Sequence, residues 1–196
     1  ERDKLFIKAP YGHNYTYNEF ENLTGQMANH LQELGIKIGA RVAVQVEKSP
    51  ESLAIYIAVV RIGAIYLPLN PAYTSKEMAY FLEDSGPSLL ISSEKTKANM
   101  AAVIQKIDLP VETLESDGRG SFMDQCQTQN QAFENVERGG DDLAAILYTS
   151  GTTGRSKGVM LSHYNLISNA KTLCECWHFS ANDILLHALP IYHTHG

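Results

Sequence analysis

The sequence predicts an α/β fold in which a parallel-rich sheet is joined by helical crossovers. Three observations predict this class. Helical and strand patterns alternate along the first half of the chain. Several of the helical patterns open on residues that cap helices, which fixes where each begins. The apolar run Leu143–Leu147 predicts a buried strand rather than a surface one.

The first helix is expected to begin after Thr16, because Thr16 and Glu19 have the spacing of a capping box. One apolar stripe then follows at spacings of three and four: Phe20, Leu23, Met27, Leu31 and Leu34. Gly35 is suited to the C-terminal end of this helix. Arg41–Val46 alternates in part between apolar and polar residues and predicts a strand.

A second helix is expected after Ser49, with Ser49 as its cap and Pro50 at its first position. Leu53–Ile65 is apolar nearly all round, which predicts a deeply buried helix. Gly63 would allow close packing against a neighbour. The two prolines in Tyr66–Pro71 are expected to end this helix, because they favour extended backbone.

Thr74 and Glu77 form a second capping box, and it opens a short helix. Its inward-facing residues are expected to be Met78, Phe81 and Leu82. Gly86 and Pro87 should end it, and Ser88–Ser92 then predicts a strand.

Residues 96–107 predict one weaker helix, followed by a short strand near Val111. Residues 115–142 are rich in Gly, Gln, Asp and Glu, and they predict a connecting loop with a short helix near Phe122. The expected division is therefore a first α/β unit, a connecting loop and a final unit, at 1–114, 115–142 and 143–196.

In the final unit one helical face is expected to gather Leu166, Ile167, Ala170, Leu173, Cys174 and Trp177. Asn165 is the expected cap of this helix, and His163 lies at its start. Asp183–Leu189 predicts a strand ended by Pro190. The residues that follow would then lie at the carboxyl end of a strand, where open α/β sheets place ligands.

Composition limits the function classes. The net charge of -6 gives no basic field for nucleic acid or for an acidic membrane surface. Three cysteines argue against a secreted disulfide framework, and Cys174 and Cys176 are expected to be packing thiols on a helix. No secretory signal is evident, and the run Leu53–Val60 is too short to span a bilayer. We therefore expect a cytoplasmic protein.

The stretch Thr149–Lys157 follows the strand at Leu143–Leu147 and consists almost entirely of hydroxyl residues and glycines, with Lys157 at its end. Hydroxyls and backbone N–H groups donate hydrogen bonds, and glycines let the backbone approach a ligand closely. Lys157 adds a compact positive charge. Together these groups suit an anion with many oxygens, such as a triphosphate.

This stretch differs from a Walker A loop. Counted from Gly151, the second glycine of that pattern would fall at Ser156, and Gly158 stands where its final hydroxyl belongs. A simple surface turn between strand and helix is the alternative interpretation. The preceding strand, the density of donors and the lysine favour a phosphate site.

Tyr148–Gly158 resembles the phosphate-binding signature of the adenylate-forming enzymes, which include acyl-CoA synthetases, luciferases and adenylation domains. It departs from that signature at Ser156, where proline is usual, and we expect this to alter the stiffness of the loop. Gly63–Pro71 is similar to a second segment of the family. Leu189–Gly196 resembles the aromatic-His segment of the family. Its His-Thr-His-Gly sequence is most similar to that of the malonyl-CoA synthetases.

The resemblance implies a ligase with ATP, Mg²⁺ and coenzyme A. A carboxylate attacks the α-phosphorus of ATP, and the thiol of coenzyme A then displaces AMP. The implied substrate is a small carboxylic acid, with malonate favoured. By the same resemblance the β- and γ-phosphates are held by Thr149, Ser150, Gly151, Thr152, Thr153 and Gly154.

The resemblance also implies the remaining roles. Lys157 neutralises phosphate charge or steadies the loop, and Ser150 or Thr152 positions Mg²⁺. His193 is the candidate catalytic residue at the junction of acyl group and nucleotide, with Tyr192 and Gly196 shaping the pocket. His193 also begins an H-x-H pair, but no third metal ligand is evident nearby in the sequence, so a pocket-shaping role is preferred.

In the family, the lysine that contacts the carboxylate lies in a small C-terminal domain, and two further ligand residues lie beyond the position of Gly196. The chain is therefore expected to be the N-terminal part of the large domain, with the C-terminal domain absent, and to be inactive alone. Within the ligases, another short-chain or aryl acyl-CoA synthetase is the alternative. A P-loop NTPase and a non-enzymatic nucleotide-binding module are the alternatives from other classes.

Overall fold

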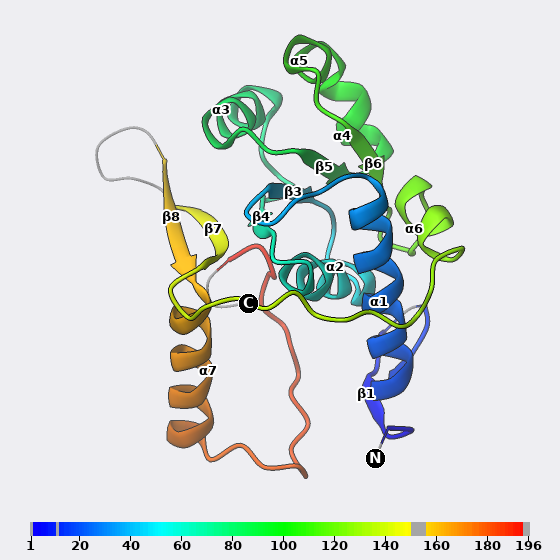
Figure 1. The fold of residues 1–196 in the computed structure, drawn as a ribbon, viewed down its shortest axis with the longest axis vertical. Coiled ribbons are helices and arrows are strands. Elements are labelled where there is room, and N and C mark those ends of the chain that lie inside the picture. Colours follow the sequence, from blue (N-terminus) through cyan, green and yellow to red (C-terminus); the bar gives the residue numbers. More distant parts are fainter. Residues whose placement is uncertain (1, 11, 150–155, 194–196) are drawn as a thin grey trace.

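The computed structural model describes residues 2–10, 12–149 and 156–193. Its centre is a six-stranded sheet in the order β6-β5-β3-β4-β7-β8 (Figure 1). The strands are β3 Arg41–Gln45, β4 Ile65–Pro68, β5 Leu89–Ser92, β6 Val111–Thr113, β7 Leu143–Thr149 and β8 Lys157–Ser162. All neighbouring pairs are parallel except β7 and β8. The α/β class with a parallel-rich sheet is confirmed.

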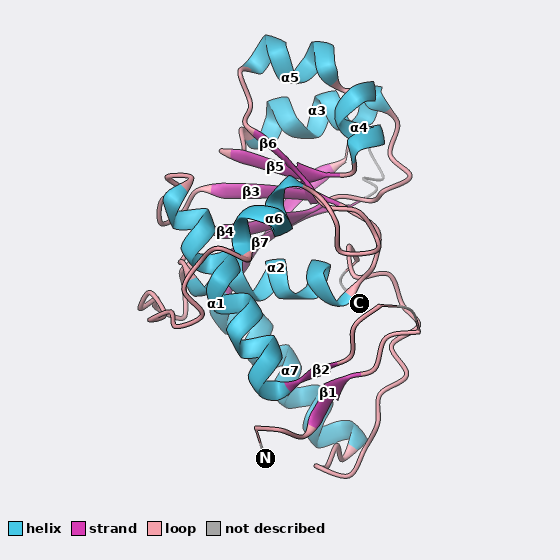
Figure 2. Cartoon of the chain, turned by 90° about the vertical axis from the view of Figure 1, so that its right-hand side faces the viewer, coloured by secondary structure: helices cyan, strands magenta, loops and turns pink. Residues whose placement is uncertain are grey.

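Helices cover both faces of the sheet, with α1, α2 and α6 on one side and α3, α4 and α5 on the other (Figure 2). Their bounds are α1 Tyr17–Glu33, α2 Pro50–Arg61, α3 Ser75–Ser85, α4 Glu94–Asn99, α5 Ala101–Ile107 and α6 Ser121–Cys126. Successive strand residues face opposite layers: Val42 and Val44 join the core with α1 and α2, whereas Ala43 joins the core with α3. Burial on both faces explains why these strands are apolar throughout.

The helix starts confirm the capping predictions. Thr16 and Thr74 each complete a capping box, and Ser49 caps α2 with Pro50 in the first turn. The predicted stripe of α1 is buried up to Leu31, whereas Leu34 lies just past the helix and is exposed. Gly86 ends α3 in the left-handed conformation.

Replacing Thr74 with alanine should lower the free energy of unfolding by about 1 kcal/mol. Thr74 Oγ1 accepts from the N–H of Glu77 at 3.4 Å, and Glu77 Oε2 accepts from the N–H of Thr74 at 2.8 Å. The N–H of Thr74 and its hydroxyl both donate to the carboxylate of Glu77, and these two bonds lower the pKa of Glu77. The stabilisation from that carboxylate is therefore present at neutral pH and is lost as pH falls through the lowered pKa. Urea unfolding at pH 7 measures the loss, and Thr74→Ser, which keeps the hydroxyl, should stay close to the parent.

The prediction of a helix through Ile65 is wrong, because α2 ends at Arg61 and β4 occupies Ile65–Pro68. Gly63 turns the chain between them with φ +73°, which an L side chain rarely adopts. A Cβ there would lie 3.1 Å from Cγ1 of Val136, so the expected close packing at Gly63 is confirmed. Both elements are buried and apolar, so the hydrophobic pattern alone could not separate helix from strand.

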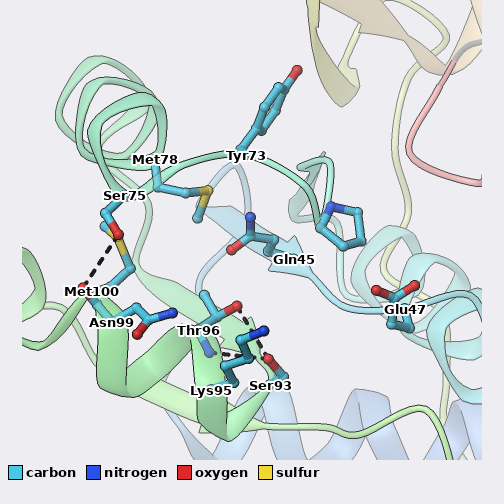
Figure 3. Close-up of a pocket in the computed structure, with 11 residues that line it drawn as sticks. Gln45, Glu47, Tyr73, Ser75, Met78, Ser93, Lys95, Thr96, Asn99 and Met100 are labelled. Atoms are coloured by element: carbon cyan, nitrogen blue, oxygen red, sulfur yellow. Dashed lines mark hydrogen bonds between the residues drawn. The ribbon is translucent and has the colours of Figure 1, made fainter.

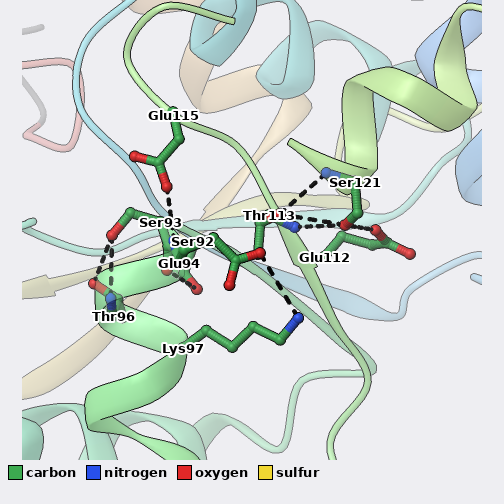
Figure 4. Close-up of polar contacts among 9 residues, drawn as sticks. All are labelled: Ser92, Ser93, Glu94, Thr96, Lys97, Glu112, Thr113, Glu115 and Ser121. Carbon is green, nitrogen blue, oxygen red and sulfur yellow. Dashed lines mark hydrogen bonds and ion pairs between the residues drawn. The ribbon is translucent and has the colours of Figure 1, made fainter. Parts of the chain in front are cut away.

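The helix predicted over 96–107 is two helices, α4 and α5, interrupted at the buried Met100. The first begins at Glu94, earlier than predicted, because Ser93 caps it (Figure 4). Figure 4 also shows the carboxylate of Glu115, whose Oε1 accepts from the N–H of Glu94 at 2.8 Å. A side chain distant in sequence thus fixes the start of α4.

Residues 127–142, which we call the strap, run across α1 and α2 from α6 to β7, and α6 is the short helix predicted near Phe122. Arg61 holds the strap from α2: Nε donates to Asn135 Oδ1 at 2.7 Å and Nη2 donates to Phe133 O at 3.0 Å. Asn29 holds it from α1, donating to Asn130 O at 2.8 Å. The strap is therefore bound at several points along its length. The boundaries at 1–114, 115–142 and 143–196 stay predictions.

Two short strands that the sequence did not predict, β1 Leu5–Ile7 and β2 Tyr15–Thr16, form a separate antiparallel pair. Downstream, α7 spans His163–Trp177 and confirms the predicted helix. Its cap is Ser162 rather than Asn165, whose side chain instead completes the capping box.

The predicted inward face of α7 is wrong in this structure: no residue of α7 is buried, and Trp177 is 64% exposed. Cys174 and Cys176 are exposed too, so they are not packing thiols here. In the structure α7 contacts mainly β8 and extends away from the sheet.

The strand predicted over Asp183–Leu189 does not form, and Ile184 is 96% exposed. A strand requires a neighbour for its backbone groups, and among the described residues none pairs with this segment. Lys48 supplies other partners, since its Nζ donates to His187 O at 2.5 Å and to Leu189 O at 3.0 Å. Across the described ranges, no helix has the length and apolar character needed to cross a membrane.

Candidate functional site

The predicted phosphate loop joins two strands that pair antiparallel, β7 and β8. Strands β7 and β8 pair antiparallel from Leu143 to Ser162, and their last described pair is Thr149 with Lys157. The structure therefore brings these two predicted site residues together, both exposed, at the base of the loop. The other predicted loop residues lie outside the described ranges: Ser150, Gly151, Thr152, Thr153 and Gly154.

The hairpin base lies at the edge of the sheet where the parallel strands have their carboxyl ends. Strand β7 runs parallel to β4, which in turn runs parallel to β3. The carboxyl end of β7 at Thr149 therefore points the same way as those of β3 and β4. Open α/β sheets bind ligands at this edge.

Side chains from β7 pack closely against Gly158, the residue next to Lys157. A Cβ on Gly158 would lie 3.0 Å from Cγ2 of Ile146 and 3.5 Å from Cζ of Tyr148. The bare backbone at Gly158 lets the ring of Tyr148 pass across the hairpin. The register of the two strands places Lys157 opposite Thr149.

Helix α3 contacts both arms of the hairpin. The hydroxyl of Tyr80 donates to Ser156 O at 2.9 Å, and the hydroxyl of Tyr148 donates to Asp84 Oδ2 at 2.5 Å. The rings of Phe81 and Tyr148 pack with centroids 4.5 Å apart. Burial, and next the bond to Asp84, raise the pKa of Tyr148 above its ordinary value, so the phenol stays protonated as the donor.

The terminal motif is described as far as His193. Tyr192 is half-buried and His193 is exposed, and Gly196 lies outside the described ranges. Burial raises the pKa of Tyr73, and Glu77 and Tyr192 raise it further, which places Tyr192 within electrostatic reach of Tyr73. Tyr192 therefore lies near the loop before α3. Lys157 begins β8, and its position is set by pairing with β7.

A polar pocket of about 280 Å³ opens between α3 and α4, at the carboxyl ends of β3 and β5 (Figure 3). Gln45 is only 2% exposed; its Nε2 donates to Asn70 O at 2.8 Å, and its Oε1 has no hydrogen-bond partner among the described residues. Figure 3 shows Lys95, Thr96 and Asn99 of α4 across from it.

Of the predicted site residues that the structure describes, none lines this pocket. The pocket could not be predicted from the sequence, because its walls come from three separate segments. The position of Gln45 at the end of a buried parallel strand is the one signal that could have found it.

The described donors fit a polyphosphate. A hydroxyl and an ammonium face each other across the hairpin base, where the two strands lead into the glycine-rich loop. The residues proposed for Mg²⁺, Ser150 and Thr152, lie outside the described ranges. Among the described residues, no three His, Cys, Asp or Glu side chains gather as metal ligands.

The sequence is similar to a known enzyme family and to individual enzymes within it. The sequence matches the family described as AMP-binding enzyme over residues 1–196. It is 35% identical to an oxalate–CoA ligase of Arabidopsis thaliana, covering 100% of this chain and 39% of that protein. It is 29% identical to a malonate–CoA ligase of the same plant, covering 99% of this chain and 34% of the relative.

Among solved structures, the chain resembles MatB from Rhodopseudomonas palustris, which has been crystallised both apo and with ATP bound. The TM-score is 0.95 at 50% identity, over 100% of this chain and 39% of MatB. The chain thus spans less than two-fifths of the length of each of these three proteins.

Proposed function

Because the chain belongs to the family of AMP-binding enzymes, we propose that it is the N-terminal part of the large domain of an acid–CoA ligase. The complete protein would convert a carboxylic acid, ATP and coenzyme A into an acyl-CoA, AMP and pyrophosphate. One observation carries this proposal: Thr149 and Lys157 face each other at the base of the glycine-rich hairpin, on the ligand-binding edge of the sheet.

The hairpin residues hold the β- and γ-phosphates through hydroxyls and backbone N–H groups, from Thr149 to Gly154. Lys157 offsets phosphate charge as the anionic carboxylate approaches, which lowers the electrostatic barrier between two anions. Mg²⁺, positioned by Ser150 or Thr152, supplies Lewis-acid charge when bound. Tyr192, His193 and Gly196 shape the acid pocket, with His193 at the junction of acid and nucleotide.

Malonate is the proposed acid. Both plant ligases named above act, by their names, on short dicarboxylates, oxalate and malonate. The terminal motif resembles that of malonyl-CoA synthetases, which favours malonate of the two. A dicarboxylate requires a cation for its second carboxylate. Another short-chain or aryl acid is the alternative substrate, and the cytoplasm is the proposed compartment.

Acid-dependent ATP–pyrophosphate exchange by the complete protein tests both the reaction and the acid. With malonate, methylmalonate, oxalate, acetate and benzoate compared, we expect kcat/KM for malonate to exceed that for acetate at least about tenfold, the effect of one charge-assisted contact. If kcat/KM were highest with oxalate, acetate or benzoate, malonate would be refuted as the substrate, but the protein would still be an acid–CoA ligase. Binding of ATP without exchange for any acid would favour a non-enzymatic nucleotide-binding module.

A further inference from the structure

Helix α3 holds both strands of the hairpin near the loop through Tyr80 and Asp84, two residues for which the sequence alone suggested no role. Tyr80 and Asp84 are four residues apart, so they lie on one face of α3. Tyr80 bonds to Ser156, directly before β8, and Asp84 bonds to Tyr148, near the end of β7. Phe81 packs against the ring of Tyr148 between these two bonds.

The two bonds flank the loop closely. Tyr148 directly precedes Thr149, and Ser156 directly precedes Lys157. Both predicted ligand residues at the hairpin base are therefore one residue away from an anchor to the same helix. A rotation or slide of the hairpin relative to α3 would break at least one of these bonds.

The anchor at Ser156 uses the backbone. Tyr80 donates to the carbonyl oxygen of Ser156, which any residue at this position would offer, proline included. The departure from the family signature at Ser156 therefore leaves the anchor in place. The specific partner is the phenol of Tyr80, so its hydroxyl is the group to remove.

We propose that Tyr80, Tyr148 and Asp84 are positioning residues for ATP, because they fix the hairpin to α3 with Thr149 and Lys157 in register for the phosphates. This inference rests on the proposed function of the hairpin. Holding Thr149 and Lys157 in place before ATP arrives reduces the conformational entropy that these two residues lose on binding. Without the anchors the same donors are present but less well ordered.

Tyr80→Phe and Tyr148→Phe in the complete protein test the proposal, with ATP–pyrophosphate exchange as the readout. Each variant should raise KM for ATP roughly three- to tenfold, the effect of one lost hydrogen bond, with KM for the acid unchanged. Asp84→Ala should match Tyr148→Phe. Asp84→Asn keeps an acceptor for the phenol and should restore KM for ATP close to the parent value.

Tyr17→Phe is the matched control, because Tyr17 lies at the start of α1 and its hydroxyl makes no hydrogen bond among the described residues. If KM for ATP in both Tyr80→Phe and Tyr148→Phe stayed within twofold of the value for Tyr17→Phe, the positioning role would be overturned. So would equal increases in KM for ATP and for the acid, which indicate a general structural loss.

Lys157→Ala separates this inference from the proposed function. If Lys157→Ala impairs the use of ATP while the tyrosine variants do not, the anchor is wrong and the phosphate site stands. If Lys157→Ala also leaves KM and rate unchanged, Lys157 is not part of the phosphate site, and the proposal that the anchors position it for ATP fails.

Discussion

Replacing Lys157 with alanine should lower kcat/KM for ATP in pyrophosphate exchange about 100-fold, the usual scale for losing one preorganised group that stabilises developing charge. Lys157 pairs with Thr149 at the hairpin base and is exposed there, so its ammonium is free to reach a bound phosphate. The reaction brings a carboxylate against a polyphosphate, and removing a positive charge raises the barrier between them. Exchange kinetics with the complete protein measure the effect.

Lys37→Ala is the matched control for that substitution. Lys37 is also exposed, but it precedes β3 and therefore lies at the amino-terminal edge of the sheet, opposite the hairpin base. Its loss should change kcat/KM less than twofold. Lys157→Arg keeps the charge but changes its shape, so an intermediate value is expected. Equal activity of Lys157→Ala and Lys37→Ala would remove Lys157 from the site.

Gly25→Ala should lower the free energy of unfolding by about 3 kcal/mol, the upper range for an overpacked interior. Helix propensity alone predicts the opposite sign, since alanine stabilises a helix by about 1 kcal/mol relative to glycine. Packing decides, because a Cβ on Gly25 would lie 1.9 Å from the carbonyl oxygen of Gln131 in the strap. The obstacle is backbone, so no side-chain rotation relieves it.

The strap cannot move away cheaply. Asn29 donates to its backbone at Asn130 and Ala132, and Arg61 donates to Phe133 O. Accommodating the methyl group would stretch or break these bonds. Thermal unfolding should show a midpoint lower by roughly 10 °C. Gln32→Ala, an exposed substitution in the same helix, controls for propensity and should change the midpoint little. A stabilised Gly25→Ala would mean that the strap is loosely held.

Local signals in the sequence were sufficient for the helix starts. A capping box is a contact between residues three apart, so Thr16 and Thr74 were identified without knowledge of the fold. The parallel sheet followed from the alternation of elements, and the comparisons support the same class.

Elements that depend on distant partners were not predictable in the same way. The segment Asp183–Leu189 has the pattern of a strand, but its carbonyls bond to Lys48 rather than to a neighbouring strand. Strand β8 was missed because the glycine-rich loop before it obscures the pattern, and its identity as a strand depends on pairing with β7.

The candidate site divides in the same manner. The ligand residues of the hairpin were recognisable from one continuous stretch that ends at Lys157. The residues that hold the hairpin, Tyr80 and Asp84, are 76 and 64 positions from their partners in sequence, and only the tertiary structure brings them to it. Gln45 was missed for the same reason, since its pocket is assembled from separate segments.

A crystal structure of the complete protein with ATP and Mg²⁺ tests the phosphate site most directly. We predict that the β- and γ-phosphates lie over the hairpin between Thr149 and Lys157, with the ammonium of Lys157 about 3 Å from a phosphate oxygen. A nucleotide bound elsewhere, with the hairpin making no contact to its phosphates, would contradict the proposed site and the function built on it.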